Sequence, residues 1–92
     1  MWKEQWDALP GAELIREGLR DADAGRESIP ALLVSIGAMR LARSGILVAR
    51  PLSRPESRLY ELLQGEHGDG AHSKYNALLR RLMSFERSVE SA

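Results

Sequence analysis

The 92-residue sequence contains no cysteine, only five aromatic side chains and no excess of charge of either sign. Without cysteine, disulfides, thiolate metal sites and cysteine nucleophiles are excluded. The thirteen basic and thirteen acidic side chains cancel, which argues against a general nucleic-acid-binding role, because such domains usually carry a basic total. The apolar share of 43% and the charged share of 28% are typical of globular rather than disordered proteins.

Long hydrophobic runs are also missing. The longest apolar stretch extends from Ile29 to Met39 and is interrupted by Ser35 and Gly37. A membrane-spanning helix needs about 20 apolar residues, and the first residues lack the apolar region of a secretory signal. We therefore expect one cytoplasmic domain over residues 1–92, with no membrane association.

The sequence also lacks the common catalytic motifs, namely a phosphate-binding glycine loop, a dinucleotide fingerprint and a His-Glu-x-x-His helix. The two histidines, His67 and His72, lie within seven residues of Glu66 and Asp69. These groups suit a divalent metal, but a glycine-rich segment does not fix ligands. We predict a polar turn here, and a protein that is not an enzyme and uses no metal or cofactor.

Glycine and proline divide the chain into four predicted helices, because helices favour proline just inside their start and glycine just past their end. The predicted helices cover residues 10–24, 29–44, 54–64 and 70–90. Trp2, Trp6 and Leu9 share one helical stripe, which indicates a short leading helix or an extension of the first helix. The expected fold is all-α, a compact bundle of four to five helices.

The predicted helix over residues 29–44 is apolar in nearly every direction, so we expect it to be the buried central helix. Ser28 is a favourable cap for its first turn. A buried strand over residues 31–36 is the competing interpretation, and the length and capping signals favour the helix. Gly37 lies at its middle, and Gly18 lies inside the first helix; both would allow another helix to approach closely.

The segments around the third predicted helix follow from local signals. Ser53 and Glu56 match a capping box. Three glycines within residues 64–70 predict a flexible loop, with Asp69 as the cap of the next helix. The connection over residues 46–52 is expected to be extended and to bury Leu47, Val48 and Leu52.

The long C-terminal helix over residues 70–90 has apolar side chains at alternating spacings of four and three: Ala71, Tyr75, Leu78, Leu82, Phe85 and Val89. Such a seam packs a helix against a bundle, or less often against a second copy. Beside it lies a polar stripe of His72, Asn76 and Arg80. These groups either recognise an anion or a partner carboxylate, or are simply solvated.

The zero net charge is unevenly distributed. Residues 1–30 carry four basic and seven acidic groups, residues 31–60 five and one, and residues 61–92 four and five. The basic groups of the middle band are Arg40, Arg43, Arg50, Arg54 and Arg58. They suit phosphate contacts, while the acidic first segment offers them internal partners. A helix-turn-helix is excluded, because its second helix would be apolar on all sides.

These observations predict a small non-catalytic interaction module that self-associates as a homodimer or serves as a subunit of a larger assembly. The candidate partner-binding residues are Trp2, Trp6, His72, Asn76 and Arg80. The tryptophans either pack back onto the domain or anchor a partner. The alternative function is an accessory nucleic-acid or anion-binding protein that uses the five arginines of the middle band.

Overall fold

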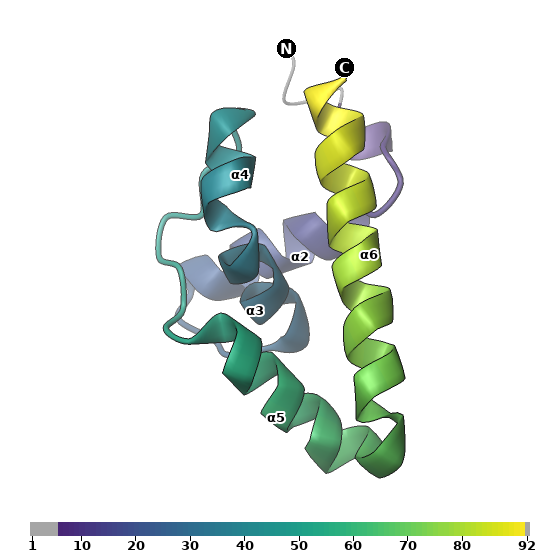
Figure 1. Cartoon of the computed structure of the whole chain (residues 1–92). Helices are drawn as coiled ribbons and strands as arrows, with labels where there is room; N and C mark the ends of the chain where they lie inside the picture. Colours follow the sequence, from purple (N-terminus) through teal and green to yellow (C-terminus); the bar gives the residue numbers. More distant parts are fainter. Residues whose placement is uncertain (1–5, 92) are drawn as a thin grey trace.

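The computed structural model describes residues 6–91, and every regular element within them is helical (Figure 1). The elements are η1 (Trp6–Ala8), α2 (Ala12–Asp23), α3 (Ile29–Ile36), α4 (Ala38–Arg43), α5 (Pro55–His67), η2 (Gly68–Gly70) and α6 (Ala71–Glu90). The prediction of an all-α bundle with a long C-terminal helix is therefore confirmed.

Helix α3 lies at the centre of the bundle and contacts α2, α5 and α6. Figure 1 shows α2 passing behind α3, while α5 and α6 form a V joined at η2. Helix α4 lies at the opposite end of the molecule from that turn. The radius of gyration is 12.7 Å, close to the value of about 12 Å expected for a compact chain of this length.

The core is built from side chains of every long helix. The largest fully buried residues are Ile15, Leu32, Leu33, Val34, Leu41, Leu59, Leu63 and Phe85. Helix α3 supplies three of them in succession, because its neighbours cover it on most sides. The expectation of a buried central helix is therefore correct for α3.

The predicted helix over residues 29–44 is divided in two at Gly37, and its second part is mostly not buried, contrary to the prediction. Ser28 caps α3 as expected, its Oγ accepting a hydrogen bond from the Ala31 N–H at 3.2 Å. The helix ends at Ile36, and α4 begins after Gly37 in a new direction. Only Leu41 of α4 is buried, and Met39 is 79% exposed.

Gly37 explains where the break occurs. A Cβ atom at Gly37 would lie 2.6 Å from Glu86 Oε2 and 3.1 Å from Leu82 Cδ1, because α6 passes directly against this point. Glycine is also a poor helix former. The break therefore coincides with the contact that the sequence suggested for Gly37, namely the close approach of another helix.

Helix α5 starts without the predicted capping box. Arg54 precedes it in a left-handed conformation (φ 48°) with no side-chain cap, and Pro55 begins the helix. Proline is favourable at this position because its φ is already helical. The helix continues through Gly65, so the predicted loop over residues 64–70 is wrong. Asp69 lies within η2 and does not cap α6, which follows Gly70 without a side-chain cap.

The connection after α4 buries a different side chain from those predicted. Gly45 turns the chain at φ 85°, and the Ile46 N–H donates to the Leu41 carbonyl at 3.0 Å. Ile46 therefore faces the core and is 4% exposed, whereas Leu47 is 74% exposed. Val48 and Leu52 are half-buried. The prediction that Leu47 packs on the core is wrong.

The apolar seam of α6 is used within one chain. Ala71, Leu78, Leu82, Phe85 and Val89 are buried, and Tyr75 is half-buried against Tyr60. The seam is therefore not available for a coiled coil between two copies.

Two glycines in helices provide a matched test of the contact between α2 and α3. A Cβ at Gly18 of α2 would lie 2.7 Å from Val34 Cγ1 and closer still to the Pro30 carbonyl oxygen, whereas nothing lies within 4 Å of one at Gly65 of α5. We expect Gly18→Ala to lower the free energy of unfolding by about 1–3 kcal/mol through overpacking. Gly65→Ala should raise it by about 0.5–1 kcal/mol. Urea denaturation measures both, and equal effects would contradict the close α2–α3 contact.

Candidate functional site

Of the two tryptophans in the predicted partner-binding set, the structure describes only Trp6. Trp2 lies outside the described residues. Trp6 is 7% exposed, and its ring packs edge-on against Phe85, with centroids 5.5 Å apart and planes at 82°. The Arg16 guanidinium lies 5.7 Å from the centroid of the same ring. Trp6 therefore packs back onto the domain, the first of the two expected alternatives, and does not belong to a docking surface.

The polar stripe of α6 lies on the outward side of that helix. His72 and Arg80 are exposed, and Asn76 is half-buried. His72 Nε2 and Asn76 Nδ2 are 3.3 Å apart, so these two side chains pair with one another. The role of the three residues in binding a partner stays a prediction.

The histidine cluster is not assembled. His67 Nε2 lies 3.7 Å from Glu66 Oε1 at the end of α5, and His72 pairs along α6 instead. Within residues 6–91, no three histidine, aspartate or glutamate side chains are grouped so that they could hold a metal ion.

A small pocket lies between the chain start and α6, with a volume of about 300 Å³. Its charged lining residues are Asp7, Glu13 and Arg81; the others are Ala8, Leu9, Gly11 and Ala12. This lining contains no hydroxyl, thiol or imidazole group.

The arginine band is divided by internal ion pairs. Arg58 of α5 binds Glu27 with Nε–Oε2 and Nη2–Oε1 distances of 2.7 and 2.6 Å, and it also pairs with Glu61. The hydrogen bond from Arg58 lowers the pKa of Glu27. The acidic first segment thus neutralises one arginine of the band, as the charge distribution suggested.

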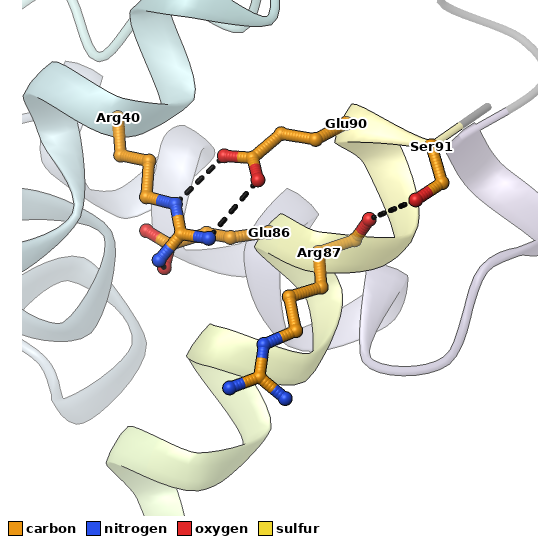
Figure 2. A network of polar contacts seen from close by, with 5 residues as sticks. All are labelled: Arg40, Glu86, Arg87, Glu90 and Ser91. Atoms are coloured by element: carbon orange, nitrogen blue, oxygen red, sulfur yellow. Dashed lines mark hydrogen bonds and ion pairs between the residues drawn. The ribbon is translucent and has the colours of Figure 1, made fainter.

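Arg40 is held between α4 and α6 (Figure 2). Its Nε and Nη2 donate to the two carboxylate oxygens of Glu90 at 2.7 and 3.0 Å. Its Nη1 lies 3.3 Å from Oε1 of Glu86. The neighbouring Arg87 points away from this cluster (Figure 2). We call Arg40, Glu86 and Glu90 the α4–α6 clamp, because two charged groups of α6 hold the single arginine of α4 that faces them.

Glu86 is the unusual member of the clamp, with a side chain only 5% exposed. Burial raises the pKa of its carboxyl, Arg40 lowers it, and the nearby Glu90 raises it again. The pKa of Glu90 is lowered, first of all by the hydrogen bond from Arg40. Sequence reasoning missed Glu86, because a charged residue beside an apolar seam usually faces water.

Three arginines of the band remain exposed: Arg43, Arg50 and Arg54. Within residues 6–91 they take part in none of the ion pairs that the structure shows. They lie in a stretch, residues 28–55, that contains no acidic residue. The same stretch holds the two most exposed large hydrophobic side chains of the described residues, Met39 and Leu47.

We call Met39, Arg43, Leu47, Arg50 and Arg54 the arginine edge. It consists of α4, at the end of the molecule opposite η2, and of the connection that runs from α4 along the side of the molecule to the start of α5 (Figure 1). Sequence reasoning found its arginines but assigned Met39 and Leu47 to the core. The break at Gly37 and the inward turn of Ile46 expose them instead.

The clamp can be tested through its carboxylates. Replacing Arg40 with glutamine should raise the pKa of both Glu86 and Glu90, because the guanidinium that favours their charged forms is removed. Arg43→Gln is the control: Arg43 lowers the pKa of Glu90 only, so Glu86 should titrate as in the wild type. NMR titration of the side-chain carboxyls measures both groups, and a Glu86 pKa that ignores Arg40→Gln would contradict the clamp.

Comparisons with known proteins add no relative. No protein-family model, curated protein or solved structure matches this chain. Among the helices of residues 6–91, none is both long and apolar enough to cross a membrane.

Proposed function

We propose that this chain is a non-catalytic protein-interaction module whose docking surface is the arginine edge. The observation that carries the proposal is the exposure of Met39 and Leu47, at 79% and 74%, in a surface segment free of acidic residues. Together with Met83 they are the exposed large hydrophobic residues of the described chain. Two of the three lie within nine residues.

The composition of the edge suits a protein partner. Arginine and methionine are enriched in protein interfaces, and a flexible thioether adapts to irregular surfaces. Removing Met39 and Leu47 from water would contribute about 25 cal/mol per Å² of apolar surface. The three arginines provide hydrogen bonds and direction, and they favour a partner with carboxylates.

The edge is also held in place before any partner arrives. Leu41, just before the end of α4, and Ile46, just after it, are both buried and hold α4 against the core. The clamp attaches Arg40 to α6. A surface that is already ordered loses less conformational entropy on binding.

Nucleic-acid or anion binding through the arginine band is the second candidate. The exposed arginines Arg43, Arg50 and Arg54 favour it. Two observations weaken it: Arg40 and Arg58 are neutralised by internal carboxylates, and residues 28–54 contain no aromatic side chain on which a base would stack.

Site-specific photo-crosslinking distinguishes these functions. A photo-reactive amino acid would replace Met39 or Leu47 in cells, with Glu66, exposed on α5, as the control position. We expect protein adducts at positions 39 and 47 that survive nuclease treatment and are absent at position 66. Nuclease-sensitive adducts would favour the second candidate, and equal labelling at all three positions would contradict a docking surface at the arginine edge.

A stability comparison separates the docking role from a folding role. The double variant Met39→Ser/Leu47→Ser should keep the free energy of unfolding within about 0.5 kcal/mol per substitution, because both side chains are exposed. Leu41→Ala, in the same segment but fully buried, should lower it by about 2–5 kcal/mol. Urea denaturation followed by circular dichroism measures both variants. A large loss in the double variant would mean that Met39 or Leu47 supports the fold.

A further inference from the structure

We propose that the partner of the arginine edge is a second copy of this chain, which docks through the outward acidic face of α2. This inference rests on the proposed function, since it uses the same edge. It specifies the occupant, the surface that the occupant presents and the kind of assembly that results.

The acidic face of α2 consists of Glu13, Glu17 and Asp23, all exposed. Helix α2 packs on α3 through its opposite side, where Ala12, Ile15, Gly18 and Ala22 are buried. Glu13 and Glu17 lie one turn apart, and like charges at this spacing destabilise a helix by about 0.2–0.5 kcal/mol. Arg16 and Arg20, each three residues after one of these glutamates, already offset part of this repulsion, and a cationic partner would offset more of it.

The acids of this face differ from the other acidic residues that the structure describes in the first segment, which form internal ion pairs. Asp7 pairs with Arg16, Asp21 with Arg26, and Glu27 with Arg58. Glu13, Glu17 and Asp23 take part in no ion pair that the structure shows within residues 6–91. Two basic residues share the exposed side of α2: Arg20, three residues from both Glu17 and Asp23, and Arg16, whose side chain is 43% exposed and pairs with Asp7. The outward side therefore keeps an excess of acidic over basic groups.

The acidic face and the arginine edge therefore carry charges of opposite sign that take part in no internal ion pair within residues 6–91. Three exposed acids and one exposed arginine lie on the outward side of α2, and three exposed arginines lie between the end of α4 and the start of α5. A net charge of zero means that two copies do not repel one another as wholes. Complementary patches steer encounter and fix the orientation of two partners. Leu14, half-buried and three residues from Glu17, offers apolar surface to Met39 and Leu47.

The two surfaces belong to different sides of the molecule. Figure 1 shows α2 behind α3, and α4 beyond the end of α3. The acidic face lies on the side of α2 opposite the residues that are buried against α3. A contact between unlike surfaces leaves one acidic face and one arginine edge free at the ends of each pair. Such a head-to-tail contact builds longer assemblies or closed rings. It differs in this respect from the predicted homodimer.

Charge reversal tests the contact on the full chain. The variants are Glu13→Lys/Glu17→Lys and Arg43→Glu/Arg50→Glu, each measured by sedimentation velocity over a concentration series at low salt. Each variant alone sets like charges against one another, so its self-association should weaken by about tenfold or more. An equimolar mixture should associate again, because each variant keeps the surface that the other has lost. Added salt should weaken the wild-type assembly.

A matched control is Glu66→Lys/Asp69→Lys at the end of α5 and in η2, which changes the net charge by the same amount as the α2 variant. It should associate like the wild type. Circular dichroism confirms that every variant is folded. A wild-type chain that stays monomeric at the highest soluble concentration, or folded reversed variants that stay monomeric when mixed, would overturn the proposal.

The crosslinking results separate failure of this inference from failure of the proposed function. Adducts of position 39 or 47 with a different protein, from a chain that stays monomeric, would overturn the second-copy partner and leave the docking role intact. Absence of both protein adducts and self-association would overturn the two proposals together.

Discussion

The close approach of neighbouring helices at two glycines is the constraint on which the rest of the structure depends. At Gly18, α2 crosses α3 with no room for a Cβ atom, and at Gly37 the chain lies directly against α6. Because both neighbours approach so closely, α3 is covered on most sides with only eight residues. A chain of this length has few side chains with which to fill a core, and close contacts at glycine reduce the volume that they must fill.

Local sequence signals predicted the elements whose geometry is set locally. The Ser28 cap, the long seam of α6 and the helical class were readable because each depends on residues within one or two turns. The break at Gly37 was not readable, because a helix apolar all round gives no sign of where it changes direction. Residues 64–70 led to the opposite error, because their glycines predict a loop where α5 continues. The helix tolerates Gly65, and Gly68 alone, at φ 54°, makes the turn.

The arginines of the candidate site could be predicted from the sequence, but their ion-pair partners could not. The arginine band is visible from the spacing of charges, but Arg58 finds Glu27 across 31 residues and Arg40 finds Glu90 across 50. Only the fold decides which arginines are neutralised and which remain for a partner. The exposure of Met39 and Leu47 was equally hidden, since a hydrophobic residue in an apolar stretch is normally assigned to the core.

The short α4 has a consequence for how the molecule opens. Proteins unfold locally in cooperative units whose stability follows their buried contacts. Helix α4 has six residues, one buried side chain and one ion pair with Glu90 of α6. It therefore forms a unit of low stability next to the well-buried α3. Its backbone amides should therefore exchange with solvent through openings that leave the central helix closed. The surface that would meet a partner is thus ordered in the folded state, and its local openings leave the bundle around it folded.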